Sequence, residues 1–154
     1  KVGFAWAGSP THRNDRVRSI PLSRLSRLFE ISDAAFFSLQ RGHGAEQLLS
    51  IPENRRPFDY GSRTETYADL AGVMANLDVV VSVDTAPLHL AGALGVKTYG
   101  LIQRSPDWRW GLAGERTMWY DSVTLLRQER LFDWDSCVAR LESLLREDAG
   151  LRAC

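Results

Sequence analysis

The chain contains 154 residues, 44% of them hydrophobic and 25% charged, which is enough for one globular domain with a full hydrophobic core. Its 19 basic and 19 acidic residues cancel, so the overall charge favours neither nucleic acid nor an anionic membrane as a partner. No segment approaches the length of a membrane span.

Apolar runs with the length of strands alternate with stretches of helical spacing. The strand-like runs cover residues 2–7, 34–39, 57–60, 79–83, 97–102 and 123–127. The helical stretches cover residues 21–31, 45–50, 64–76, the segment after Val83, and 134–147; Thr64 is expected to cap the third without a full capping box. This alternation predicts a single α/β domain over residues 1–154, with a doubly wound parallel sheet of about six strands and helices on both faces.

The cysteines and the first residues bear on the setting of the protein. Cys137 and Cys154 are too few to predict a disulfide framework or a metal site, so we expect free thiols in a reducing, cytoplasmic compartment. The chain opens directly on a strand-like run, without an initiator methionine or a signal peptide, and we expect it to be a piece of a larger protein.

The junction at Asp84 and Thr85 carries the strongest functional signal. A β-branched run ends there, and a helix rich in small residues follows, with Pro87 placed in its first turn. The free N–H groups of such a helix start would stabilise an anionic ligand at the carboxyl edge of the sheet. The alternative, which the junction alone leaves open, is that Asp84 and Thr85 only cap the helix and that His89 is a buried, hydrogen-bonded side chain.

A long polar loop, residues 8–19, follows the first strand and contains hydroxyl groups and three arginines. Such a loop can surround an anion, although it is neither a G-x-G-x-x-G fingerprint nor a P-loop. The alternative is a solvated loop whose arginines pair with nearby acids such as Asp15. Because ligands of doubly wound sheets bind at the carboxyl ends of the strands, where the winding reverses, we expect the loop and the junction to face the same site.

Aromatic residues cluster after the fifth strand-like run, in Asp107-Trp108-Arg109-Trp110 and in Trp119-Tyr120. Aromatic faces beside an arginine suit sugar or base stacking, and they also suit packing or a domain interface. Five tryptophans in so small a domain favour packing.

Three separated motifs resemble a known family. They are residues 76–95 at the junction, Trp6-Ala7-Gly8-Ser9-Pro10 with residues 14–21 in the polar loop, and Asp107-Trp108-Arg109-Trp110. The first resembles the donor-site motif of the heptosyltransferase-like glycosyltransferases of family 9, which have GT-B architecture. Together, in this order, they resemble the C-terminal glycosyltransferase-like region of bacterial tetratricopeptide-repeat proteins. The resemblance implies a Rossmann-like domain that forms one half of a GT-B fold and binds a nucleotide-diphosphate sugar.

The resemblance also implies a role for each matching residue. For the diphosphate, Ser9 and Thr11 would contact it, Thr85 with the amides of Ala86 and Leu88 would hold phosphate, and Arg18 would stabilise the leaving group. For the nucleoside, Gln40 and Gly42 would lie near the ribose, and Thr64 and Glu65 would flank the base. Asp84 would bind sugar hydroxyls, and His89 would orient the loop or touch the donor. The absence of an Asp-x-Asp triplet at a strand end predicts that no metal or other cofactor is needed.

The chain departs from the family pattern at two positions. Heptosyltransferases usually have lysine where Arg18 stands and a small residue where Pro87 stands, which leaves the donor open. In inverting enzymes of the family, the acceptor site and the general base lie in an N-terminal domain, which we expect to lie outside the 154 residues given. We therefore expect that the chain alone binds a donor weakly and transfers nothing.

Two functions stay open at this point. One is the donor half of an inverting glycosyltransferase, acting on a protein, glycan or lipid acceptor that upstream helical repeats select. The other is a non-catalytic nucleotide-sugar-binding or scaffold module on a helical-repeat protein. A nicotinamide-binding or methyl-donor-binding Rossmann domain is disfavoured because the glycine fingerprint is missing.

Overall fold

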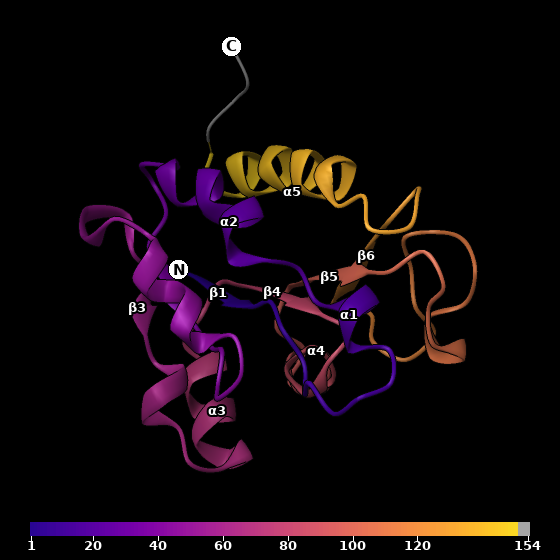
Figure 1. Cartoon of the computed structure of the whole chain (residues 1–154), viewed down its shortest axis with the longest axis horizontal. Coiled ribbons are helices and arrows are strands. Elements are labelled where there is room, and N and C mark those ends of the chain that lie inside the picture. The colour runs from indigo at the N-terminus through magenta and orange to yellow at the C-terminus, as the bar shows by residue number, and fades with distance from the viewer. Residues whose placement is uncertain (151–154) are drawn as a thin grey trace.

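A six-stranded parallel sheet organises the chain in a computed structural model that describes residues 1–150 (Figure 1). Its strands, in sheet order, are β3 (Phe58–Asp59), β2 (Phe36–Ser38), β1 (Val2–Ala5), β4 (Val79–Val83), β5 (Thr98–Ile102) and β6 (Val123–Arg127). The chain builds outward from β1 to β3, then crosses back to place β4 on the other side of β1. The prediction of a doubly wound α/β fold is confirmed, and its winding reverses between β1 and β4.

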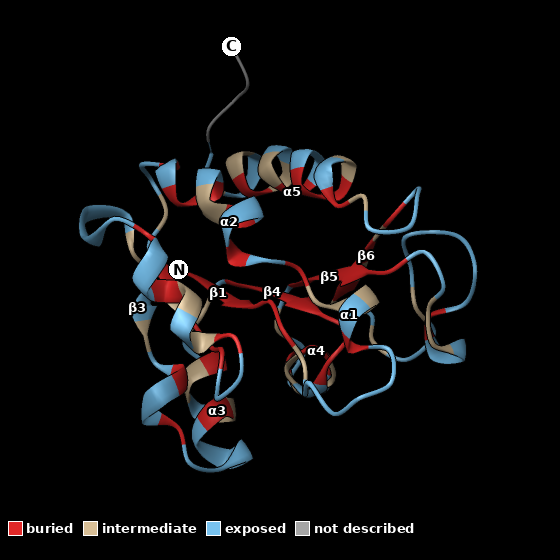
Figure 2. Ribbon diagram, viewed as in Figure 1, coloured by how far each residue is buried: buried red, intermediate tan, exposed pale blue. Residues whose placement is uncertain are grey.

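Helices cover both faces of the sheet (Figure 1). The helices are α1 (Asp15–Arg18), α2 (Leu22–Leu25), α3 (Tyr67–Met74), α4 (Ala86–Ala93) and α5 (Asp135–Asp148), and 3₁₀ turns cover residues 26–30, 45–50, 53–55, 61–63 and 108–110. α2 and α5 lie over one face, while α3 and α4 lie over the other. The strands between them are buried on both sides, as Figure 2 shows, which explains why Val79–Val83 reads as an unbroken apolar run.

The predicted helix over residues 21–31 is two shorter elements. α2 ends at Leu25, and a 3₁₀ helix continues over Ser26–Glu30. Leu22, Leu25 and Leu28 are spaced three apart and are all fully buried. A spacing of three aligns side chains on a 3₁₀ helix as well as on an α-helix, so this pattern did not distinguish the two.

The cap of α3 also differs from the prediction. Thr66, not Thr64, caps the helix: its Oγ1 accepts from the N–H of Asp69 at 3.1 Å, and Asp69 Oδ2 accepts from the N–H of Thr66 at 2.8 Å. The sequence Thr66-x-x-Asp69 is thus a full capping box. Thr64 is buried, and its hydroxyl donates to the carbonyl of Gly61 at 3.0 Å.

Cys137 is a free thiol whose pKa is raised to about 11, mainly by burial, and Cys154 lies outside the described residues. A Cβ on Gly92 would stand 2.5 Å from the ring of Tyr120, so the lack of a side chain at this position of α4 lets the Tyr120 ring pack directly against the helix. Within residues 1–150, no helix is both long and apolar enough to span a bilayer.

Candidate functional site

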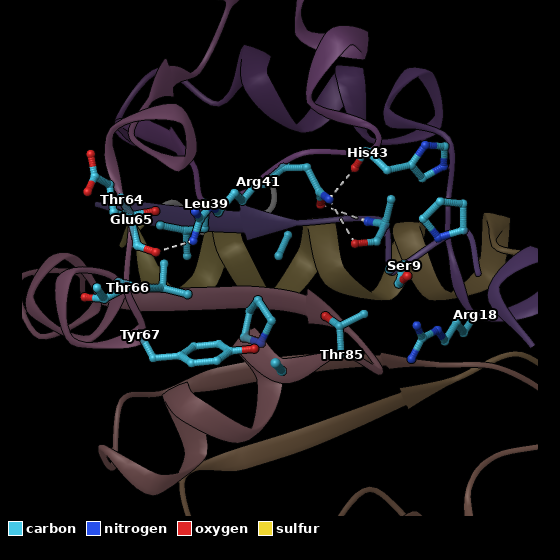
Figure 3. Close-up of a pocket in the computed structure, with 18 residues that line it drawn as sticks. Ser9, Arg18, Leu39, Arg41, His43, Thr64, Glu65, Thr66, Tyr67 and Thr85 are labelled. Atoms are coloured by element: carbon cyan, nitrogen blue, oxygen red, sulfur yellow. Dashed lines mark hydrogen bonds between the residues drawn. The ribbon is translucent and has the colours of Figure 1, made fainter. Parts of the chain in front are cut away.

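A cavity of about 750 Å³ opens at the carboxyl ends of the strands, beside the point where the winding reverses (Figure 3). Ligand pockets typically measure about 300–1,000 Å³, so a nucleotide-sized ligand fits. The cavity has two ends. We call one the α4 end, formed by Gly8, Ser9, Arg18, Thr85, Ala86 and Pro87, and the other the α3 end, formed by Leu39, Arg41, Thr64, Glu65, Thr66 and Tyr67.

The α4 end is built on the junction after β4. Thr85 is the N-cap of α4 with an extended backbone, but its hydroxyl does not cap the helix and donates instead to the carbonyl of Val83 at 3.2 Å. Pro87 has no N–H, and the N–H of Leu88 donates to the carbonyl of Thr85 at 3.0 Å. Of the first three helical positions, Ala86 therefore contributes the N–H group that has no partner within residues 1–150.

Arg18 enters the α4 end from the polar loop. Its Nε donates to Asp15 Oδ1 at 3.2 Å, and its Nη1 donates to the carbonyl oxygen of Asp84 at 2.9 Å. The side chain is only 13% exposed. Arg18 therefore pairs with Asp15, as the surface-loop alternative had it, and lines the cavity at the same time.

Gln40 lines the cavity, two residues after the end of β2, and is buried. Its Oε1 accepts from the N–H groups of Trp6 and Ala7, both at 3.0 Å. Its Nε2 donates to the carbonyls of Ala7 at 2.9 Å and His43 at 2.7 Å. Since these bonds occupy both sides of the amide, Gln40 serves to join the end of β1 to the loop after β2.

The α3 end is more open. The side chains of Arg41, Glu65 and Tyr67 are exposed, and Tyr67 extends from the start of α3 toward Thr85 in Figure 3. A guanidinium N–H of Arg41 donates to the carbonyl of Glu65. The pKa of Asp69, in the capping box behind them, is lowered, chiefly because the backbone N–H of Thr66 donates to it.

The structure brings together part of the predicted residue set. Ser9, Arg18, Gln40, Thr64, Glu65, Thr85 and Ala86 line the cavity, whereas Thr11, Gly42, Asp84, Leu88 and His89 do not. Thr11 shares a 2.8 Å hydrogen bond with Ser9, and the buried carboxylate of Asp84 accepts from Gln103 at 3.4 Å. Arg41, His43, Thr66, Tyr67 and Pro87 also line the cavity and were not predicted to do so. The signal that could have indicated Thr66 and Tyr67 is the capping-box pattern Thr66-x-x-Asp69 at the start of α3.

His89 belongs to an aromatic cluster beside the cavity. It stacks on Trp110 with ring centroids 5.0 Å apart, and its Nδ1 lies 3.1 Å from the hydroxyl of Tyr120. Its pKa is lowered, mainly by burial. His89 thus lies close enough to Tyr120 for a hydrogen bond, as the alternative of a buried, hydrogen-bonded histidine expected, but it is only half-buried.

The two tryptophans of the motif Asp107–Trp110 differ in their burial. Trp110 is buried, as the packing interpretation expected, whereas Trp108 is 72% exposed and contacts Trp119 edge to face. Arg109 lies over the Trp108 ring and pairs with Asp107 at 3.3 Å.

The fold and the cavity define a doubly wound, Rossmann-like α/β domain with a ligand-sized site at its switch point. The model of glycosyltransferase family 9 (heptosyltransferase) matches residues 46–130. The chain therefore belongs to glycosyltransferase family 9.

Two solved structures share the fold of this chain, and one curated protein is similar to it in sequence. The Escherichia coli heptosyltransferase WaaC with ADP has a TM-score of 0.66 at 14% identity, over 97% of this chain and 45% of that one. The E. coli ADP-heptose LPS heptosyltransferase II has a TM-score of 0.62 at 15% identity, over 96% of this chain and 46% of that one. Protein FlbA of Caulobacter vibrioides is 25% identical over 97% of this chain and 26% of its own length. The chain thus spans about a quarter of FlbA and under half of each heptosyltransferase.

Proposed function

We propose that this domain binds a nucleotide-diphosphate sugar in the cavity, as the donor half of an inverting glycosyltransferase. The observation that carries the proposal is the meeting of Arg18 with the start of α4 in a ligand-sized cavity at the switch point of a family 9 fold. Structures of the E. coli heptosyltransferase WaaC contain ADP in one case and ADP-2-deoxy-2-fluoro heptose in another, so ADP is the first ligand to test.

The two ends of the cavity suit the two parts of such a donor. At the α4 end, the guanidinium of Arg18 and the N–H of Ala86 suit a diphosphate, whose charge grows as the sugar departs. At the α3 end, the exposed ring of Tyr67 suits a base, because every base has a face that stacks on an aromatic ring. No metal is required in this proposal, since the arginine and the helix start supply the positive charge.

The rest of the reaction belongs to parts outside this chain. We place the acceptor site and the general base in an N-terminal GT-B domain, and we expect the acceptor to be a protein, glycan or lipid. Tetratricopeptide repeats in the same cytoplasmic, bacterial protein would select that acceptor. On this proposal, the chain alone binds the donor weakly and does not transfer the sugar.

A non-catalytic role is the second candidate, as a nucleotide-sugar-binding or scaffold module on a helical-repeat protein. It stays open because this chain supplies no buried general base: among the described residues that line the cavity, Glu65 is the only carboxylate, and its side chain is exposed to solvent. Catalysis would therefore depend wholly on a domain outside this chain. The two candidates differ in one measurement. Full-length protein supplied with a donor and a cell-extract acceptor fraction releases a nucleoside diphosphate in the first case and does not in the second.

Binding is tested by titrating ADP, UDP, GDP and ADP-sugars into the domain at up to millimolar concentration. We expect ADP to shift the amide NMR signals of Gly8, Ser9 and Ala86 and to raise the melting temperature. Exposed residues near the amino ends of the strands, such as Asp33 just before β2, serve as the internal control. If none of these ligands changes the spectrum or the melting temperature, the donor-site proposal is wrong.

A further inference from the structure

Asp15 is a buried acid at the start of α1, in the middle of the polar loop. It is 8% exposed, and its Oδ1 accepts two hydrogen bonds, from Arg18 Nε at 3.2 Å and from Ser19 Oγ at 3.0 Å. The proposed chemistry gives it no direct part, because Asp15 does not line the cavity. An acid buried to this degree needs such partners, since an unpaired buried charge is costly.

The bonds of Asp15 extend to both sides of the switch point. Ser19 Oγ, which donates to Asp15, accepts from the N–H of Gly8 at 3.0 Å, just after β1. Arg18, held by Asp15 at Nε, donates through Nη1 to the carbonyl of Asp84, just after β4. One carboxylate thus fixes the loop after β1 and, through Arg18, joins it to the start of α4.

Gly8 is part of the same arrangement. A Cβ at this position would lie 2.4 Å from Arg18 Nη2 and 2.5 Å from Asp15 Oδ1. The guanidinium and the carboxylate therefore press against the main chain, where only a hydrogen atom fits.

These contacts fix the orientation of the guanidinium. The group is planar, with five N–H donors in a fixed fork, so anchors at Nε and Nη1 determine where Nη2 points. Nη2 makes no hydrogen bond within residues 1–150. An arginine side chain that is already ordered loses less conformational entropy when it binds an anion.

We propose that Asp15 is a positioning residue for the donor diphosphate: it holds the main chain at Gly8 in place through Ser19 and fixes the Arg18 guanidinium in the geometry that binds the anion. This inference rests on the proposed function. It also predicts an effect opposite to that of simple electrostatics. Asp15 carries a negative charge near the expected position of a diphosphate, so removing that charge would tighten binding if charge alone mattered.

The test compares Asp15→Ala with Asp15→Asn, using ADP as the ligand and calorimetry or NMR titration as the measurement. Asp15→Asn removes the charge but keeps a side-chain oxygen that can accept from Arg18 and Ser19. We expect Asp15→Ala to bind ADP about three- to tenfold more weakly, the effect of releasing one ordered side chain. Asp15→Asn should bind at least as tightly as the original chain. Asp33→Ala, an exposed site near the amino ends of the strands, makes the same charge change and should have no effect.

A double-mutant cycle separates positioning from a general structural effect. Lysine at position 18 keeps the charge but lacks the planar fork that Asp15 orients. If Asp15 acts through Arg18, Asp15→Ala should weaken binding by less than about twofold in an Arg18→Lys background. An equal loss in both backgrounds would mean that Asp15 only supports the fold.

The outcomes also separate this inference from the proposed function. If the original chain binds none of ADP, UDP, GDP and ADP-sugars, the proposed function fails, and the inference with it. If it binds UDP or GDP but not ADP, that nucleotide replaces ADP in the same comparison. If it binds ADP and Asp15→Ala binds as tightly or more tightly, the inference alone is wrong. Should Asp15→Ala not fold, the original chain still decides: ordered Arg18 requires its own sharp, slowly exchanging Nε–H NMR signal, and a signal averaged with those of solvent-exposed arginines would overturn the inference.

Discussion

The two ends of the cavity are built differently. At the α4 end, Thr85 is buried, and Arg18 is hydrogen-bonded to the buried Asp15 and to the carbonyl of Asp84 before any ligand binds. At the α3 end, the side chains of Glu65 and Tyr67 are exposed to solvent, and the carbonyl of Glu65 accepts from Arg41. On the proposed function, the rigid end binds the diphosphate, which all such donors share, and the open end binds the base, which differs from one nucleotide to another.

Arg18→Ala gives the sharpest test of the rigid end. We expect ADP affinity to fall by about 30-fold or more, because hydrogen bonds to charged groups contribute about 1.5–3 kcal/mol. The free energy of unfolding should also fall, by about 1–3 kcal/mol, because Asp15 loses its ionic partner while largely buried. Calorimetry and urea unfolding measure the two effects.

The matched control is Arg13→Ala, which removes an exposed arginine from the same loop. It should change the affinity by less than about twofold, since exposed and unordered charges contribute little. Equal losses in the two variants would mean that the charge of the loop matters and its geometry does not.

Gly8→Ala tests the rigid end without removing any charge. The added methyl group would collide with Arg18 and Asp15, so we expect about tenfold weaker ADP binding and a destabilisation of about 1–3 kcal/mol. Gly72, within α3, has no atom within 4 Å of an added Cβ. Gly72→Ala should therefore leave binding unchanged and stabilise the domain by about 0.5–1 kcal/mol. A Gly8→Ala variant that behaves like Gly72→Ala would contradict the close packing described above.

Tyr67→Ala tests the open end. We expect ADP binding to weaken by about fivefold, at the low end of the effect of losing one base-stacking ring. The melting temperature should hardly change, because the side chain is 66% exposed. Tyr67→Phe keeps the ring face and should keep the affinity. If Tyr67→Ala binds ADP normally, the base does not stack at this end.

The capping box of α3 provides the smallest expected effect on binding. Thr66→Ala should cost about 1 kcal/mol of stability, measured by urea unfolding, and should change ADP affinity by less than about twofold. A large loss of affinity would show that the open end also depends on a rigid frame.

The same box makes stability depend on pH. The pKa of Asp69 lies below its ordinary value of 3.8 in the folded state, so its contribution is complete above that value and is lost as the pH falls through the folded-state pKa. The difference in unfolding free energy between the original chain and Asp69→Ala should therefore be constant near neutral pH and shrink below 3.8. A difference that does not change with pH would exclude the charged form as the stabilising one.

Apart from the two-residue strand β3, the strands could be predicted from sequence because each is a short, mostly buried apolar run with its own local signal. Val79–Val83 and Val123–Arg127 fall on the predicted residues, since buried parallel strands need no partner to be recognised. The order of the strands in the sheet was not readable, because it depends on how crossovers pack. The split of residues 21–31 was not readable either, because its leucines suit both kinds of helix.

The cavity was predicted in outline and not in detail. The loop after β1 and the start of α4 were expected to meet, and both line the cavity. The bond from Arg18 to the carbonyl of Asp84 joins residues 66 positions apart, and no local pattern announces such a contact. The cap at Thr66 could have been found, because its partner Asp69 lies three residues away in the sequence.

Gln40 has a consequence for anyone who wishes to redesign the cavity. Its amide uses its oxygen for two main-chain donors and its nitrogen for two main-chain acceptors, so neither Glu nor Leu can replace it without stranding buried groups. Engineering toward another donor should therefore hold Gln40 constant and vary Arg41, Glu65 and Tyr67. The reason to keep Gln40 is thus structural: its amide is bonded to the main chain on both sides and is not free to contact the sugar nucleotide.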